Sequence, residues 1–408
     1  MELTFISGGI TSPRGFRASG IHCGLRKNKS KSDLACIAAD KVCTSAAVFT
    51  TNKVFAAPVG VTRAHLANGT AQAVICNSGN ANTCNNDGYD KANATCRALA
   101  KELNIDENDI IVASTGVIGV PLPIEPILSG IPNLVSELSY TSDASESAAI
   151  AIMTTDTKKK EYAVEYTFDG KIIRLGGICK GSGMIEPNMA TMLGFITTDA
   201  NISAQMLDTA LHAIIADTFN MISVDGDTST NDMVAVMASG MSDSALIDCE
   251  NEAFCAFSAA MRELCLHMCR AIAADGEGAT RLIECNITNF SSVAGAKKLA
   301  KSVIKSPLVK SMIFGADANC GRILCALGYS GAEINPDVID VFMRSKAGTI
   351  QVCENGCGMR FDEDFAKEVL TKNYIYIDVD MKCGECAATA WGCDLSYEYV
   401  RINGDYRS

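Results

Sequence analysis

Residues 180–195 read Lys180-Gly181-Ser182-Gly183-Met184-Ile185-Glu186-Pro187-Asn188-Met189-Ala190-Thr191-Met192-Leu193-Gly194-Phe195. The two glycines allow sharp turns and close backbone approach, and the proline fixes its own φ and removes a backbone donor. The apolar residues that follow Thr191 predict a strand. A tight loop that exposes the Ala190-Thr191 peptide bond beside a hydroxyl group is a candidate for self-cleavage.

The chemistry of such a cleavage can be written from the residues. If the Thr191 hydroxyl attacks the Ala190 carbonyl, the chain moves from nitrogen to oxygen, and water then releases a free α-amine on Thr191. That amine can act as the general base for its own hydroxyl, so no distant histidine is needed. Glycine-rich spacing is a weak signal, however, and an ordinary turn between two strands fits the same pattern.

Residues 180–195 closely resemble the segment of ornithine acetyltransferases at which the precursor cuts itself before its catalytic threonine. These enzymes are the bifunctional glutamate N-acetyltransferase family of arginine biosynthesis. Further stretches resemble the same family in the same order, and the resemblance covers essentially the whole chain. They are Asn77–Asn82, Ser114–Gly119, Met153–Thr157, Asp225–Asp232, Gly276–Thr280, Trp391–Leu395 and Val400–Ser408.

The resemblance implies roles for individual residues. Thr191 matches the nucleophile and Ala190-Thr191 the cleaved bond, while the Thr115 hydroxyl and the Gly116 N–H match the oxyanion hole. A glycine suits that role, because its amide can face a reacting carbonyl closely. The matching substrate contacts are Thr154, Lys180, Thr191, Glu277, Asn403 and Ser408.

Two of these contacts also have a chemical reason. Donor and acceptor would both carry an α-carboxylate, so we assign Lys180 to that group. Glu277 lies between two glycines, which would let its carboxylate approach a ligand's ammonium group. From the residues alone, Glu277 is also compatible with a solvated turn, and Ser114-Thr115-Gly116 with a polar turn after a strand.

The implied reaction has two halves. Thr191 takes the acetyl group from N2-acetylornithine and releases ornithine, and glutamate then attacks the acetyl ester to give N-acetylglutamate. A shared covalent intermediate predicts ping-pong kinetics. The resemblance leaves open whether acetyl-CoA is a second donor, and it implies that the cleaved segments assemble as an α2β2 heterotetramer.

Composition limits the classes of protein to be considered. Hydrophobic residues make up 48% of the chain and charged residues 20%, which indicates a globular protein. The net charge of −12 and the lack of a long basic cluster argue against a nucleic acid partner. We find neither a leader pattern nor an apolar run of membrane-spanning length, so we expect a cytoplasmic protein without a membrane partner.

The resemblance implies an α/β fold, a layered αββα sandwich similar to N-terminal-nucleophile hydrolases but differently connected, with a C-terminal α/β domain. We expect residues 1–190 to form the alpha chain of the core and residues 191–288 to complete it. Residues 289–408 would form the C-terminal domain, whose tail returns to the active site. The pattern itself predicts a hairpin through Asp169-Gly170, because that dipeptide favours a two-residue turn.

Periodicity predicts further elements. Apolar runs predict strands at residues 35–38, 46–51, 73–76, 110–113, 192–198, 350–352 and 374–380. Helical spacing predicts helices at residues 87–103, 145–152, 252–273 and 297–305, and one begun by Ser203.

The chain contains nineteen cysteines, and two pairs of them suggest a competing site. Cys353 with Cys357 and Cys383 with Cys386 could supply four thiolates to zinc, and a zinc-binding structural protein is therefore one alternative. The resemblance implies no metal and no cofactor. In a reducing cytosol, we expect the cysteines to behave as small buried apolar residues. A self-cleaving amidohydrolase or aminopeptidase of related fold is the other alternative.

Overall fold

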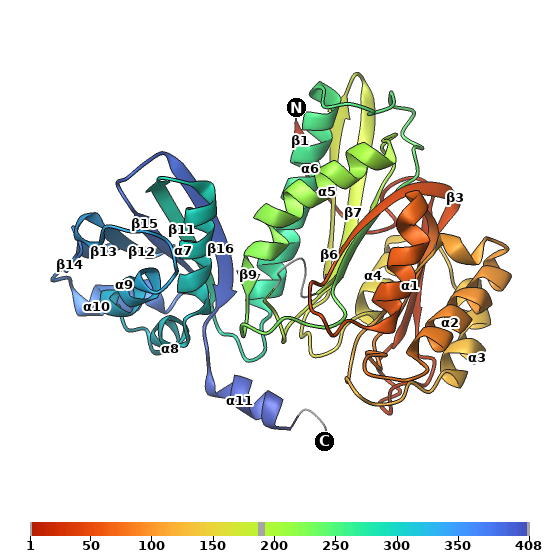
Figure 1. Ribbon diagram of the computed structural model, residues 1–408, viewed down its shortest axis with the longest axis horizontal. Coiled ribbons are helices and arrows are strands. Elements are labelled where there is room, and N and C mark those ends of the chain that lie inside the picture. Colours follow the sequence, from red (N-terminus) through yellow and green to blue (C-terminus); the bar gives the residue numbers. More distant parts are fainter. Residues whose placement is uncertain (1, 187–191, 406–408) are drawn as a thin grey trace. The chain divides into compact units, whose positions relative to one another are not determined.

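The computed structural model describes residues 2–186 and 192–405 of the chain (Figure 1). Its contacts divide it into two compact units. The described part of the first unit comprises residues 2–181, 192–219 and 228–268, and that of the second comprises residues 182–186, 220–227 and 269–405. Each unit contains one β-sheet.

The first unit is built on a nine-stranded mixed sheet in the order β1-β6-β7-β8-β10-β3-β4-β5, with β2 paired to β3. The pairs β8–β10 and β4–β5 are parallel, and the other pairs are antiparallel. The strands are β1 (Leu3–Ile6), β2 (Phe16–Ile21), β3 (Leu34–Phe49), β4 (Thr70–Asn77), β5 (Ile110–Ser114), β6 (Lys160–Phe168), β7 (Lys171–Lys180), β8 (Leu193–Thr198) and β10 (Met233–Ala238). The helices are α1 (Ala57–His65), α2 (Gly88–Leu103), α3 (Glu125–Ser136), α4 (Ser142–Ala151), α5 (Ala204–Asp217) and α6 (Glu252–Ala274), whose last six residues are counted with the second unit.

Strand β3 explains why helices cover both faces of this sheet. Ala35, Ile37 and Ala39 point into a core that α4 closes, whereas the alternate residues Leu34 and Cys36 point into a core closed by α1, α2 and α3. Successive side chains of a strand face opposite sides, so a stretch buried on both faces is a continuous apolar run, as residues 34–39 are. The sequence predicted two short strands here, but β3 is one continuous strand whose pairing with β4 shifts register between Ala38 and Cys43.

The predicted hairpin is confirmed, and it determines where the central loop begins. Strands β6 and β7 are joined by Asp169 and Gly170, whose φ angles of 46° and 71° are those of a type I′ turn. Strand β7 then pairs antiparallel with β8, and in this register Lys180 lies opposite Leu193. The loop of residues 181–192 therefore leaves and re-enters the sheet at neighbouring positions.

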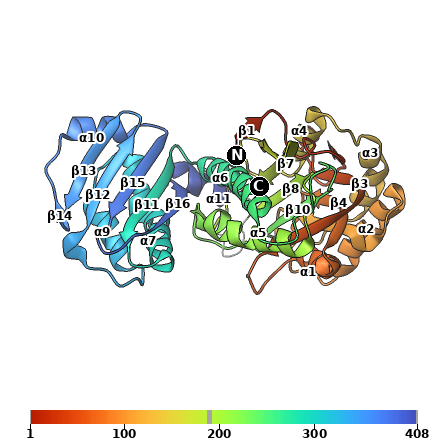
Figure 2. The same ribbon diagram turned by 90° about the horizontal axis from the view of Figure 1, so that it is seen from above.

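The second unit contains a seven-stranded sheet in the order β14-β13-β12-β15-β11-β16-β9. Strands β13, β12, β15 and β11 are seen side by side in Figure 2. Its strands are β9 (Ile222–Ser223), β11 (Leu282–Phe290), β12 (Asp340–Ser345), β13 (Gly348–Glu354), β14 (Cys357–Gly358), β15 (Tyr374–Asp380) and β16 (Cys386–Cys393). Its helices are α7 (Val293–Lys305), α8 (Pro307–Gly315), α9 (Cys320–Gly328), α10 (Glu363–Leu370) and α11 (Tyr397–Gly404). Short 3-10 helices occur at Leu66–Asn68, Glu107–Asp109, Phe219–Met221 and Pro336–Val338.

The alternation of buried and partly exposed residues shows which face of the second sheet is covered. Every second residue of β12 and β15 is buried, as expected of strands with one covered face. Helix α7 packs on β11 and β16 through Leu299 and Val303, which are fully buried. The sequence predicted this helix from Lys297. It begins earlier because the Ser292 hydroxyl accepts a hydrogen bond from the Gly295 N–H and caps it.

The remaining predicted helices are confirmed, with ends that differ from the prediction by at most three residues. Helix α2 begins one residue later than expected, and α5 follows Ser203, whose hydroxyl accepts a hydrogen bond from the Met206 N–H. The α/β class is confirmed as well. Among residues 2–186 and 192–405, no helix is long and apolar enough to cross a membrane.

A buried ion pair lies within the first unit. The Lys160 ammonium group is 2.6 Å from the Asp156 carboxylate, and the two side chains are 1% and 0% exposed. Burial alone would raise the pKa of Asp156. The charges of Lys180 and Lys160, with hydrogen bonds from Lys160 and the Gly181 N–H, outweigh burial and lower the pKa to about 2.

This shift predicts an acid dependence of stability. Because the folded-state pKa lies below the ordinary value of 3.8, ionised Asp156 stabilises the fold above about pH 4, and this contribution disappears as pH falls through 2. The shift corresponds to roughly 2 kcal/mol. Urea unfolding between pH 5 and pH 2 should show a steeper loss of stability for the wild type than for Asp156→Asn.

Asp199 provides the control with the opposite sign. Burial raises its pKa, although the Arg174 and Arg14 amides donate hydrogen bonds to it. The folded state therefore favours the protonated form of Asp199. The contribution of Asp199 to the free energy of unfolding is largest at low pH and falls as pH rises through the folded-state pKa. Asp199→Asn should lose more stability than the wild type on acidification. Parallel curves for the wild type and Asp156→Asn would contradict the assignment.

Candidate active site

The first group of site residues lies where the parallel strands β4 and β5 end. The Asn77 side chain donates a hydrogen bond to the Ser114 hydroxyl at 2.7 Å, and the Asn77 carbonyl accepts one from the Thr115 N–H at 2.9 Å. The Asn77 side-chain oxygen also accepts the Gly79 and Asn80 amides. Since the carboxyl ends of parallel neighbours meet at one edge, the Asn77–Asn82 and Ser114–Gly119 stretches form one platform.

Gly116 is held in a backbone conformation that suits an oxyanion donor. Its φ is +133°, and a Cβ atom at this position would lie 2.8 Å from the Asn80 nitrogen, so a larger residue cannot replace it without movement. Across the described ranges, no hydrogen bond uses the Gly116 N–H as its donor. Asn231 holds the adjoining backbone, since its side chain donates to the Ser114 carbonyl at 2.7 Å and the Ala81 carbonyl at 2.6 Å.

Lys180 reaches the same platform from the end of β7. Its side-chain nitrogen lies 3.4 Å from the Thr115 hydroxyl oxygen, and the residue is 8% exposed. An ammonium group that is largely buried beside a hydroxyl favours a negative charge nearby. The structure therefore brings Thr115, Gly116 and Lys180 together.

Thr154 joins this group through a residue whose role sequence reasoning missed. The Asp156 carboxylate accepts the Thr154 N–H at 3.0 Å on one oxygen and the Gly181 N–H at 2.7 Å on the other. Asp156 appeared in the sequence only as part of a matching stretch, and its closeness to Lys160 in the chain was the one available sign of pairing. Thr154 and the end of β7 are thus held by one side chain.

The second group belongs to the second unit and includes two predicted substrate contacts. Glu277 is 6% exposed, and its carboxylate accepts a hydrogen bond from the Asn403 side chain at 2.8 Å. The Glu277 N–H donates to the Ser182 carbonyl at 2.9 Å. A Cβ atom on Gly183 would lie 2.4 Å from this carboxylate, which explains a glycine at that position. Asn403 lies on α11 and is exposed.

The same unit anchors residues 182–186. Asp225 accepts the backbone amides of Met184 at 2.6 Å and Ile185 at 2.8 Å, and the Ser182 hydroxyl donates to the Asp275 carbonyl at 2.7 Å. Glu186 forms ion pairs with Lys301 at 3.1 Å and Lys305 at 3.0 Å. The segment that precedes Pro187 is therefore fixed by hydrogen bonds and charge.

Tyr399 also contacts the Asp225 carboxylate, at 3.3 Å. Burial and the neighbouring carboxylate both raise the pKa of this phenol, so it remains a neutral hydrogen-bond donor. No local pattern in the sequence indicated this anchoring role for Asp225 or Tyr399. Their partners are backbone amides and side chains distant in the chain.

Three predicted site residues lie outside the described residues. They are Ala190 and Thr191, at the proposed cleavage point, and Ser408 at the carboxyl end. Their predicted roles stay predictions.

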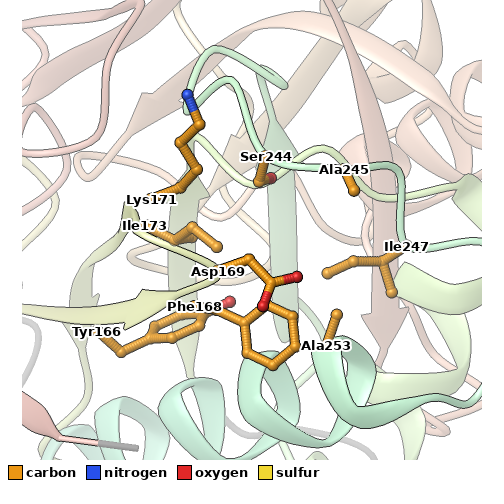
Figure 3. Close-up of a pocket in the computed structure, with 9 residues that line it drawn as sticks. All are labelled: Tyr166, Phe168, Asp169, Lys171, Ile173, Ser244, Ala245, Ile247 and Ala253. Atoms are coloured by element: carbon orange, nitrogen blue, oxygen red, sulfur yellow. The ribbon is translucent and has the colours of Figure 1, made fainter.

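One cavity of the first unit lies apart from the predicted site residues. Figure 3 shows this pocket, which is lined by residues of the β6–β7 hairpin, among them Tyr166 and Phe168, and by Ser244, Ala245, Ile247 and Ala253. Its volume of about 30 Å³ is on the scale of a water molecule, too small for an amino acid. It contains none of the predicted site residues.

The cysteine pairs were the alternative that would have required a metal. All nineteen cysteines are free thiols, with Cys353 buried and Cys357 and Cys383 exposed. In the part of the chain that the structure describes, no group of three or more His, Cys, Asp or Glu side chains could hold a metal ion.

Comparison with known proteins places these observations in a family. Residues 17–408 match the ArgJ family. The arginine biosynthesis bifunctional protein ArgJ of Caldanaerobacter subterraneus subsp. tengcongensis is 48% identical, with all of both chains covered. ArgJ 1 of Clostridium acetobutylicum is 49% identical, with 98% of this chain and 97% of the relative covered. The crystal structure of ArgJ from Bacillus halodurans matches with a TM-score of 0.50 and 45% identity, covering 52% of this chain and 99% of that one.

The family match and the two relatives cover almost the entire length of the chain. The α/β fold, with one sheet in each unit, agrees with the expectation from the resemblance. Since the family match covers residues 17–408 and full-length relatives share nearly half of their residues with it, this chain belongs to the ArgJ family.

Proposed function

We propose that this chain is a glutamate N-acetyltransferase of arginine biosynthesis, which moves acetyl from N2-acetylornithine to glutamate through an ester on Thr191. The observation that carries the proposal is the arrangement at the ends of β5 and β7. There the Gly116 amide has no other acceptor among the described residues, and the Thr115 hydroxyl lies 3.4 Å from the buried Lys180 ammonium group. Family membership supplies the reaction class.

In the proposed reaction, the Thr191 hydroxyl attacks the acetyl carbonyl and passes its proton to the Thr191 α-amine. The carbonyl oxygen becomes an oxyanion, which the Gly116 N–H and the Thr115 hydroxyl stabilise. Each such donor contributes on the order of 10²- to 10³-fold in rate. Collapse expels ornithine, whose leaving nitrogen takes up the proton. Glutamate repeats the sequence on the acetyl ester and leaves Thr191 free.

Both substrates are amino acids, and we assign their charged groups to residues of opposite sign. Lys180 binds the α-carboxylate, because it is cationic and only 8% exposed. Glu277 binds an ammonium group, with Asn403 holding its carboxylate in place at 2.8 Å. Thr154, Thr191 and Ser408 are further proposed contacts, the last two by resemblance alone.

Self-cleavage between Ala190 and Thr191 creates the α-amine that this mechanism needs. Two observations support it. Residues 182–186 are held by Asp225 and by the ion pairs of Glu186, so the upstream end would remain anchored after cleavage. The solved chain from Bacillus halodurans is covered to 99% but matches only 52% of this chain, the length expected of one of two cleaved segments.

Assembly and a second donor complete the proposal. Residues 1–190 and 191–408 would remain associated in an α2β2 heterotetramer located in the cytoplasm, consistent with nineteen free thiols. Relatives that share nearly half of their residues are named bifunctional, which favours acetyl-CoA as an additional donor to glutamate. A hydrolase of related fold would instead use water as the acceptor.

The first prediction concerns the intact mass of the purified protein. We expect two fragments, and the one that begins at Thr191 should gain a single acetyl group when N2-acetylornithine is added without glutamate. Addition of glutamate should remove that acetyl group and yield N-acetylglutamate. Thr191→Ala should remain one uncut chain without an adduct.

Other results would decide against the proposal. A cleaved wild type that releases acetate at the same rate with and without glutamate would favour the hydrolase. An uncut wild type that shows no acetyl adduct would refute the threonine mechanism.

The second prediction concerns Glu277→Gln. Glutamine keeps the acceptor for Asn403 but loses the charge, and a hydrogen bond to a charged group contributes about 1.5–3 kcal/mol. We therefore expect the KM values for N2-acetylornithine and glutamate to rise by roughly 10- to 100-fold, as measured by steady-state kinetics.

Glu284→Gln is the matched control in the same unit. Glu284 is 7% exposed and accepts hydrogen bonds from Trp391, at 2.7 Å, and Tyr374. Its substitution should leave both KM values within a factor of two or so if only Glu277 contacts substrate. Equal increases in the two variants would contradict a binding role for Glu277.

A further inference from the structure

The Asp156 carboxylate of the first unit accepts hydrogen bonds from two backbone amides and one side-chain ammonium group. We propose that Asp156 is a positioning residue for acetyl transfer, and that its ionised carboxylate fixes Thr154 and Lys180-Gly181 relative to each other. This inference rests on the proposed function, because Thr154 and Lys180 are its proposed substrate contacts. It adds a residue that neither the resemblance nor the reaction itself assigns.

The contacts of Asp156 show what it holds. One carboxylate oxygen accepts the Gly181 N–H at 2.7 Å and the Lys160 ammonium at 2.6 Å, and the other accepts the Thr154 N–H at 3.0 Å. The side chain is completely buried. Two amides that share one carboxylate cannot move far apart, so Thr154 and the residue next to Lys180 move together.

The charges around Asp156 give the second part of the argument. Lys160 and Lys180 are both buried, at 1% and 8% exposure, and both act on the Asp156 carboxylate. Of the two, Lys180 brings its positive charge beside the Thr115 hydroxyl. That charge suits a substrate carboxylate. Without Asp156, the two ammonium groups would repel each other in a medium of low dielectric constant.

Asp199 shows what a buried aspartate with a purely structural role looks like in this protein. Asp199 is also buried, at 1% exposure, and also accepts two backbone amides, those of Arg14 at 3.2 Å and Arg174 at 2.8 Å. Neither of those amides belongs to or adjoins a proposed substrate contact. Asp156, in contrast, binds the amide of one proposed contact and the amide that directly follows another. The two aspartates therefore form a natural pair for comparison.

The kinetic consequence follows from geometry. A displacement on the order of 1 Å in a positioning element can reduce a rate about 100-fold. Asp156→Asn keeps the size of the side chain and one acceptor oxygen but removes the negative charge. The Lys180 ammonium would then be pushed away from Thr115 by Lys160, and the backbone at Gly181 would loosen.

The experiment compares the wild type, Asp156→Asn, Asp199→Asn and the double variant Asp156→Asn/Lys160→Met. Each full-length protein is examined for extent of self-cleavage, for kcat and KM in acetyl transfer, and for amide hydrogen exchange in the peptides that contain Thr154 and Gly181. Thermal unfolding confirms that each protein is folded at the assay temperature. The exchange measurement does not depend on any enzymatic activity.

We expect Asp156→Asn to reduce kcat/KM roughly 100-fold and to speed exchange at Thr154 and Gly181. Asp199→Asn should leave kcat/KM and both of these amides close to the wild type. The double variant should regain part of the lost kcat/KM, because removal of the Lys160 charge relieves the repulsion on Lys180. A residue needed only for stability would not show this rescue.

The outcomes that overturn the inference are separate from those that overturn the function. If the wild type transfers acetyl but Asp156→Asn loses no more kcat/KM than Asp199→Asn, the positioning role is wrong. It is equally wrong if the double variant is less active than Asp156→Asn. If the wild type transfers no acetyl group, the proposed function fails, and unchanged exchange at Thr154 and Gly181 would refute the geometric role of Asp156 as well.

Discussion

The antiparallel pairing of β7 with β8 is the constraint on which the candidate site depends. It places Lys180 opposite Leu193, so the segment between them starts and ends at neighbouring positions of one sheet. Because β7 is also the second strand of a hairpin with a two-residue turn, its register cannot slip without moving its buried face to the other side. Lys180 and Leu193, which flank this segment, are therefore held in a fixed register.

Each of the two units contains buried charged side chains. In the first unit, the buried Lys160 and Lys180 both interact with the Asp156 carboxylate. In the second, Glu277 is a buried carboxylate whose described side-chain partner is the neutral Asn403. A buried charge is costly unless it is compensated, so each unit separately favours a ligand group of opposite sign beside its buried charge.

Local sequence patterns predicted the elements well and the contacts less well. Asp169-Gly170 was sufficient for the hairpin, and Ser203 for the start of α5, because turns and caps depend on residues close in the chain. The continuity of β3 was missed, because the charged pair Asp40-Lys41, exposed where the pairing with β4 shifts register, interrupts the apolar run. Thr115, Gly116 and Lys180 came from resemblance, and the structure brings them together.

The roles of Asp156, Asn231 and Asp225 could not be predicted in the same way. Asn231 acts on backbone carbonyls 117 and 150 residues away, and Asp225 accepts amides 40 and 41 residues away. Backbone partners have no identity in a sequence, so a side chain that binds them carries no pairing signal. Only the tertiary fold shows which amide a carboxylate meets.

The abundance of cysteine has a physical explanation that needs no metal. Burial raises the pKa of Cys36, Cys76 and Cys179 to about 12, so at neutral pH these groups are thiols and not the thiolates that bind zinc. Cys36 and Cys76 pack between strands and helices as small apolar side chains. Packing in the interior therefore accounts for these buried cysteines, whereas Cys357 and Cys383 are exposed.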